Sequence, residues 1–264
     1  MKHFMLTLVS TWWISLLSAQ SLLLPIGKNS GIGSYSRHFQ QIMSVWNHPA
    51  GLSDLPAFSA GIYSENRFLL KAASLYGVML AVPSPAGAFG GSLVRLGNSA
   101  WHQQQLSGAY GRSLGRCAGI GLQFNYESTT AQGAGTTSAL SVDAGILWHC
   151  NEKVHTGLQV RKGMGKEMSY SGGAGFEASR DCLLTAMITG TGSTTSIKAG
   201  VYYRLINALA LEMGIASGPA YHNAAVIFYL RSLRIDIAAG FHPQLGITPS
   251  TSLIWQPATA PAAE

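Results

Sequence analysis

Apolar and polar side chains alternate along most of the chain after about residue 57, in segments that end at short clusters of Gly, Ser, Asn or Pro. In residues 140–149 the even-numbered positions are apolar, whereas the odd-numbered positions include Asp143 and His149. A strand places successive side chains on opposite faces, so this segment predicts a strand with one apolar and one polar face. The same split recurs at 118–127 and 233–242, which predicts an all-β chain.

We predict about fourteen strands, because alternating segments and turn residues recur that often along the chain. The predicted strands are residues 57–66, 72–82, 87–97, 100–113, 117–127, 138–150, 153–162, 169–178, 182–190, 194–205, 208–216, 221–230, 233–242 and 246–255. Segments of about nine to eleven residues suit strands that cross a bilayer, whereas globular strands average about five to six. An even number lets the sheet close without a free edge. The predicted fold is a closed antiparallel transmembrane β-barrel over residues 57–255.

The predicted connections fall into two sets. One set is tight, with 83–86 and 231–232 as examples, and the other contains the Gly-, Thr- and Ser-rich segment Ser128–Thr137. Outer-membrane barrels have short periplasmic turns and longer outer loops. We therefore assign the tight set to the periplasm and expect residues 128–137 to form the longest connection on the other side.

Charged residues are only 11% of the 264 residues, whereas about 25% is usual for a soluble domain. The mean hydropathy is +0.19, yet beyond the N-terminus no apolar run approaches the roughly 18 residues that a transmembrane helix needs. This combination excludes a helical membrane protein and favours a membrane barrel, in which lipid-facing and lumen-facing residues alternate. The alternative is a soluble β-sandwich, which would use the apolar face as its core.

The net charge of the chain is +6, and the basic residues are scattered rather than clustered. Nucleic-acid binding is typical of a clustered basic face, so we expect no nucleic-acid partner. The surplus positive charge favours contact with the anionic headgroups of outer-membrane lipid.

Residues 1–19 have the pattern of a secretory signal peptide. A lysine and a histidine precede the apolar stretch Phe4–Leu17, and the small residues Ser18 and Ala19 follow it. The apolar stretch is shorter than a membrane span of about 20 residues. We therefore expect cleavage after Ala19 and export to the bacterial outer membrane; an uncleaved N-terminal anchor is the alternative. Residues 256–264 form a C-terminal tail beyond the last predicted strand.

Three cysteines, Cys117, Cys150 and Cys182, would remain after export. An odd number argues against a disulfide framework. A hairpin of 117–127 with 139–150 would nevertheless place Cys117 nearly opposite Cys150, within bridging distance. The interpretation that we favour is that all three are small apolar residues at strand ends. No Cys or His spacing is that of a metal site, and we expect no cofactor.

Residues 20–56 do not alternate, so they cannot form two further regular strands. Pro49 favours extended backbone at His48, and Gly51 indicates a turn or a close backbone approach. We predict that the segment forms a small N-terminal plug, or hatch, inside the barrel, or a short cap beneath it. The most distinctive part of the hatch is a box that consists of Asn47, His48, Pro49, Ala50 and Gly51.

The order of these features resembles the FadL-like outer-membrane barrels, and most closely the PorV- and PorQ-type barrels and their uncharacterised relatives in Bacteroidota. The resemblance covers nearly the whole mature chain. The box usually reads Asn-Pro-Ala-Gly in that superfamily, and here His48 stands where Asn is expected. Three further stretches carry the resemblance: Tyr63–Phe68, Ala109–Arg112 and Phe241–Pro249.

The resemblance implies a barrel with an N-terminal hatch. FadL-type members pass hydrophobic molecules across the outer membrane, and PorV-type members serve the type IX secretion pathway. We therefore expect passage or handling of small hydrophobic substrates. The alternative is a non-transporting scaffold that binds periplasmic or secretion-system proteins.

Polar side chains on the inward face are the best functional candidates in the barrel. They either fill the interior with ion pairs and bound water, which we favour because both signs of charge are mixed, or line a passage. A strongly selective pore usually carries a ring of one sign. No Gly-x-Ser-x-Gly elbow is placed between a strand and a helix, and we expect no catalytic residues and no enzymatic activity. The candidate lumen-lining residues are Asp143, Gln159, Arg161, Glu177, Lys198, Arg204, Glu212, Arg234 and Asp236.

Overall fold

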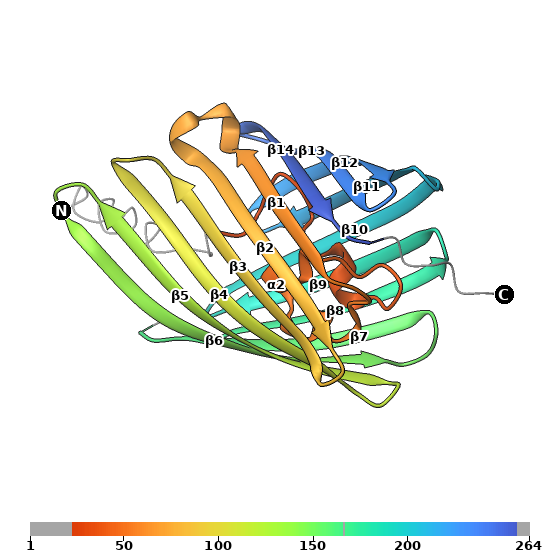
Figure 1. Ribbon diagram of the computed structural model, residues 1–264. Helices are drawn as coiled ribbons and strands as arrows, with labels where there is room; N and C mark the ends of the chain where they lie inside the picture. The colour runs from red at the N-terminus through yellow and green to blue at the C-terminus, as the bar shows by residue number, and fades with distance from the viewer. Residues whose placement is uncertain (1–22, 166, 258–264) are drawn as a thin grey trace, which may run out of the picture.

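A computed structural model describes residues 23–165 and 167–257 and shows one closed antiparallel barrel (Figure 1). Each strand pairs with its neighbours in sequence, and β1 pairs with β14 to complete the ring. The fourteen strands in this part of the chain are β1 (Ser59–Asn66), β2 (Ser74–Ser84), β3 (Gly87–Gly97), β4 (Trp101–Leu114), β5 (Ala118–Ala131), β6 (Gly135–His149), β7 (Val154–Gly163), β8 (Ser169–Ser179), β9 (Cys182–Thr191), β10 (Thr194–Ile206), β11 (Leu209–Ser217), β12 (Ala220–Leu230), β13 (Leu233–His242) and β14 (Gly246–Trp255).

The predicted closed barrel is confirmed, and the bounds of β3, β13 and β14 agree with the prediction to the residue. The prediction was wrong for the segment 128–137, which is strand rather than loop. β5 and β6 extend into it and leave only a turn at 132–134. Threonines support the extension, since Thr130 and Thr136 share a hydrogen bond of 2.9 Å between their hydroxyl oxygens across the pair, and such cross-strand pairs stabilise a sheet.

The outward face of the barrel is apolar, as the alternation predicted. Leu158 on β7 is 65% exposed, and its outward neighbours along the ring are also apolar. Trp148 and Trp255 lie outward near strand ends. Tyr202 and Tyr229 also lie near strand ends but face inward, and their hydroxyl oxygens lie 2.7 Å apart inside the barrel. No helix in the described residues is long and apolar enough to cross a membrane.

The two ends of the barrel differ. We call the end where β1 begins and β14 finishes the proximal end, and the opposite end the distal end. The tight turns that join β2 to β3 and β12 to β13 lie at the proximal end. At the distal end, β1 and β2 are connected through two 3-10 turns, η4 (Arg67–Leu69) and η5 (Lys71–Ala73).

All three cysteines lie at the proximal end and carry free thiols. Cys117 and Cys150 are exposed, and the backbone N–H of His149 donates to the carbonyl of Cys117 at 2.7 Å. The two cysteines are therefore close along the sheet but are not bridged.

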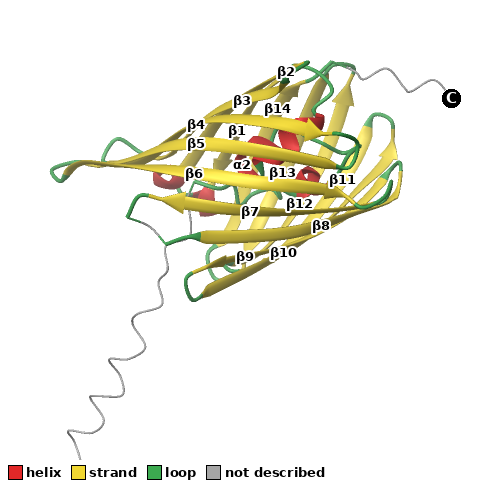
Figure 2. Cartoon of the chain, turned by 90° about the horizontal axis from the view of Figure 1, so that it is seen from below, coloured by secondary structure: helices red, strands yellow, loops and turns green. Residues whose placement is uncertain are grey.

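Residues 23–55 lie inside the ring of strands, where Figures 1 and 2 show short helices and loops surrounded by the barrel wall. We call this segment the hatch. Its helical pieces are η2 (Ile32–Tyr35), α2 (Ser44–Asn47) and η3 (Pro49–Asp54). The hatch carries much of the apolar core, including Ile42, Val45 and Leu52, which are fully buried. The apolar interior is therefore built jointly by the N-terminal segment and by inward side chains of the wall.

Candidate functional site

The hatch crosses the lumen from one end to the other. Near the distal end, Oε2 of Glu65 accepts hydrogen bonds from the backbone N–H groups of Ile26 at 3.0 Å and Gly27 at 2.9 Å. Near the proximal end, Oε1 of Glu177 accepts one from the backbone N–H of Arg37 at 2.7 Å. Two carboxylates of the wall thus fix the two ends of the first half of the hatch through charge-assisted hydrogen bonds.

Between these two points, a lysine attaches the hatch to β11 and β13. The ammonium group of Lys28 contacts Oδ2 of Asp236 and lies 3.7 Å from Oε2 of Glu212. Arg234 donates from Nε to Oδ1 of Asp236 at 2.7 Å, and the hydroxyl of Ser252 donates to Oδ2 at 2.7 Å. Two cations and two carboxylates are buried together, so none of the four charges is left without an opposite charge nearby.

The predicted box rests against glycines of the wall. A Cβ atom at Gly121 would lie 2.3 Å from the backbone nitrogen of Ala50, and one at Gly145 would lie 2.7 Å from Cε1 of His48. Neither distance leaves room for a side chain, so backbone of the hatch packs directly on backbone of β5. The inward glycines of the alternating strands were visible in the sequence, but nothing there indicated that they form the seat of the hatch.

A second set of glycines receives Tyr35 of η2. A Cβ at Gly173 would lie 2.3 Å from Cε2 of Tyr35, and one at Gly157 would lie 2.9 Å from Cε1. The ring also meets His48 edge-on, with ring centroids 5.4 Å apart. Burial raises the pKa of Tyr35 above its ordinary value, so this phenol stays neutral.

His48 is the buried centre of the box. Its side chain is fully enclosed, and Nε2 lies 3.2 Å from the backbone carbonyl oxygen of Leu158. Burial lowers the pKa of His48 to about 4, although the hydrogen bond to that carbonyl and the negative charge of Asp143 act in the opposite direction. The imidazole is therefore neutral at neutral pH and donates to the wall from Nε2.

All nine candidate lumen-lining residues lie at inward positions of their strands, where they are buried or partly buried. Most of those with described partners form ion pairs with other residues of the interior. Arg161 donates to Asp143 from Nε at 2.8 Å and from Nη2 at 2.6 Å. The guanidinium of Arg204 lies over the ring of Tyr229, 5.6 Å from its centroid. This arrangement is the one expected of charges that fill an interior.

The structure adds an apolar inner wall that the sequence analysis missed. Leu75 and Met79 of β2, and Val94 and Leu96 of β3, face inward and are buried in one cluster with Trp46 of the hatch and with Leu23. The available signal was the run 75–82, which is apolar at successive positions instead of alternating. A strand that is apolar on both faces contacts apolar material on both sides.

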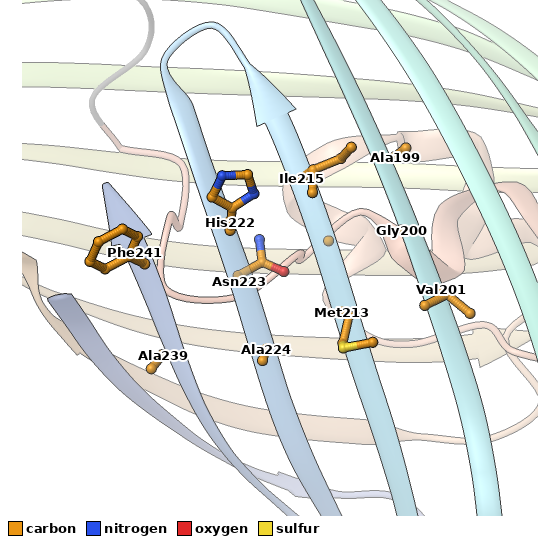
Figure 3. A pocket seen from close by; sticks show the side chains of 11 residues that line it. Ala199, Gly200, Val201, Met213, Ile215, His222, Asn223, Ala224, Ala239 and Phe241 are labelled. Carbon is orange, nitrogen blue, oxygen red and sulfur yellow. The ribbon is translucent and has the colours of Figure 1, made fainter. Parts of the chain in front are cut away.

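A separate hollow of about 580 Å³ lies over β10–β13. In Figure 3 its side chains, such as Met213, Ile215 and His222, stand on the strands with the hatch behind them. These three residues are exposed on the outward face, so the hollow belongs to the outer surface of the barrel rather than to the lumen.

The described residues contain no group of three or more His, Cys, Asp or Glu side chains that could hold a metal ion.

Comparison with solved structures identifies the fold. The CymD monoaromatic hydrocarbon channel matches with a TM-score of 0.68 and 10% identity over 90% of this chain and 99% of that one. A FadL homologue from Pseudomonas aeruginosa matches with a TM-score of 0.63 and 11% identity, over 88% of this chain and 97% of that one. The toluene transporter TbuX from Ralstonia pickettii gives 0.63 and 9%, with 89% and 97% covered. No protein-family model and no curated protein matches the sequence.

Because the hatch packs directly on Gly121, we predict that a methyl group at this position loosens the hatch. Overpacking of this kind costs about 1–3 kcal/mol. In the Gly121→Ala variant, hydrogen exchange of residues 44–54 is therefore expected to be faster by roughly fivefold to 150-fold. Gly108→Ala on β4 is the matched control, because a Cβ there meets nothing within 4 Å. Equal exchange in the two variants would show that the hatch does not rest on Gly121.

The buried His48 predicts that acid weakens the hatch. The docked hatch holds this imidazole at a pKa of about 4, whereas an undocked one titrates near 6.5, so the undocked form binds the proton first. Docking is therefore at full strength above about pH 6.5 and weakens as the pH falls towards about 4, by about 3 kcal/mol in all. Hydrogen exchange of the hatch against pH, corrected for the intrinsic rate, measures this. His48→Asn is expected to make the profile shallower between about pH 6.5 and about pH 4, because it removes the contribution of this imidazole alone; an unchanged profile would contradict the assignment.

Proposed function

We propose that this protein is a FadL-like channel of the outer membrane that passes small hydrophobic molecules, with the hatch as its plug. The observation that carries the proposal is the apolar inner wall of β2 and β3. Leu75 and Leu96 lie near the distal end, Met79 lies further along, and Ala81 and Ala88 lie near the proximal end. The inward side of β2 is therefore apolar along the length of the lumen, and on β3 only the buried Ser92 interrupts the apolar surface, which suits an apolar solute.

Two further observations support the location of the protein in the outer membrane. The outward face is apolar around the ring, as it is in barrels surrounded by lipid. The similar structures include a monoaromatic hydrocarbon channel and a toluene transporter by their own descriptions. With the usual orientation of such barrels, the proximal end with its tight turns faces the periplasm. Export would depend on the predicted signal peptide, residues 1–19, which lies outside the described residues.

The apolar wall is closed by the hatch in the structure. Trp46 lies so close to Gly77 of β2 that a Cβ there would be 2.6 Å from its ring. Leu23 is buried in the same cluster. A solute could follow the wall only after these side chains move, so the proposal requires displacement of part of the hatch.

No contact in the described residues specifically favours the alternative of a scaffold for periplasmic or secretion-system proteins. The closer likeness to PorV- and PorQ-type barrels, and with it an origin in Bacteroidota, stays a prediction from the sequence. A role for the nine polar residues in lining a passage also stays a proposal, and their ion pairs make it the less favoured one.

The first test compares the refolded mature chain with a variant that lacks residues 20–55. Reconstituted in vesicles whose outer leaflet is lipopolysaccharide, which apolar solutes cross only slowly by themselves, the variant is expected to pass toluene faster than the intact chain, because the apolar wall is uncovered. A sugar of similar size serves as the polar control solute. If both proteins insert and resist heat as barrels, and neither passes toluene, the channel function is refuted.

The second test asks whether the solute uses the apolar wall. In the variant without residues 20–55, Val94→Thr keeps the shape of the side chain but adds a hydroxyl, which costs about 1–3 kcal/mol when it faces apolar material. Toluene flux is expected to fall severalfold. Thr189→Val, the reverse exchange at an inward position of β9, is the matched control and is expected to leave the flux unchanged. Equal fluxes in the two variants would place the path elsewhere.

A further inference from the structure

Four ionisable side chains form a line across the proximal end of the lumen. Nε2 of His149 lies 3.1 Å from Oδ2 of Asp54, and Nδ1 of His149 lies 2.8 Å from Nδ1 of His155. Nε2 of His155 lies 3.0 Å from Oε1 of Glu177, an ion-pair distance without the alignment of a good hydrogen bond. The line therefore runs from carboxylate to imidazole to imidazole to carboxylate.

The two ends of the line belong to the attachment of the hatch. Asp54 is the last residue of η3, and it also accepts hydrogen bonds from the hatch residues Gln40 and Ser53. Glu177 accepts from the hydroxyl of Ser36 and from backbone N–H groups at 37 and 38, all in the hatch. The two histidines are wall residues that face each other in register on β6 and β7.

The geometry of the pair fixes the number of protons that it holds. A carboxylate only accepts hydrogen bonds, so Nε2 of His149 carries a hydrogen towards Asp54. Nε2 of His155 lies 3.0 Å from an oxygen of Glu177, and a hydrogen on this nitrogen avoids placing two acceptor atoms against each other. Although burial alone would raise the pKa of Asp54, the hydrogen bond and charge of His149 bring it below its ordinary value, so this group is ionised. Between the two Nδ1 atoms, a bond of 2.8 Å has room for one proton. The pair therefore carries a single positive charge.

We propose that His149 and His155 form a site for one shared proton that latches the hatch to the barrel wall, and that a second proton opens the latch. With a proton on each of the two Nδ1 atoms, two N–H groups would point at each other across a distance of 2.8 Å, which accommodates only one hydrogen atom. The strands beneath them are hydrogen-bonded neighbours in the ring, so the wall cannot separate. The rings must instead turn towards the lumen, which displaces Asp54 or the hatch residues around Glu177.

Two other groups face this line and define its response to pH. Ser113 of β4 donates to Oδ1 of Asp54 at 3.3 Å and does not titrate. His38 of the hatch is mostly exposed, and its Nδ1 lies 2.6 Å from Oε2 of Glu177. Protonation of His38 strengthens its attraction to this carboxylate, so His38 acts against opening. Of the groups that face this line, only the paired histidines therefore favour opening of the latch when the pH falls.

The test measures hydrogen exchange of hatch residues 36–54, corrected for the intrinsic rate, between about pH 7.5 and about pH 5.5, the range around the ordinary titration of imidazole. His48→Asn is the parent chain, so that titration of His48 does not contribute. If opening binds one further proton, exchange by the parent rises by up to about tenfold per pH unit. Adding His149→Asn is expected to flatten the profile, because a neutral amide cannot take that proton.

Three comparisons complete the test. His155→Asn must flatten the profile in the same way, which also covers the case in which the His149 variant does not fold. His222→Asn, on the outward face, must leave the profile unchanged, and His38→Asn must make it steeper. The proposal is overturned by a flat profile in the parent, by equal slopes with and without the pair, or by a shallower slope without His38. Because the measurement needs no flux, its failure would leave the proposed channel function intact.

Discussion

Closure of the ring between β1 and β14 is the constraint on which the rest of the structure depends. Six residues of β1, Ala60 to Glu65, pair with β14, and this pairing leaves no strand of the described barrel at a free edge of the sheet. A sheet without edges can turn an apolar face outward to lipid, because none of its backbone groups is left without a partner there. Closure also encloses a space that has to be filled, and the hatch fills it.

The hatch and the wall fit together through two kinds of contact. At the glycines, such as Gly121, the wall has no side chains and backbone meets backbone. Elsewhere, buried carboxylates of the wall hold the hatch: Glu65 near the distal end, Asp236 between the ends and Glu177 near the proximal end. Because a buried carboxylate is stable only with partners, these contacts fix the path of the hatch as well as holding it.

The sequence predicted the fold well because strand periodicity is a local property. Most strands show their two faces in their own residues, and most of their bounds followed from the turn residues between them. The candidate site was less predictable, since its contacts join distant parts of the chain. Lys28 lies in the segment 20–56, where no periodicity indicates which side chains are buried, yet its ammonium group contacts Asp236 in the interior. The inner wall of β2 was missed because Leu75 and Met79 break the alternation on which the analysis relied.

The route of the hatch through the lumen has a consequence for how the protein assembles. The lysine and the aspartate that join the hatch to β13 are 208 residues apart in the sequence, and contacts of such separation form slowly because a long loop must close first. The contacts of Lys28 with β11 and β13 are therefore among the last to form, whereas the backbone of Ile26 and Gly27 finds its partner Glu65 much earlier along the chain. The last strands of the chain both close the ring against β1 and supply Asp236, the partner of Lys28. The hatch therefore reaches its final position in the same step in which the ring closes, and not after it.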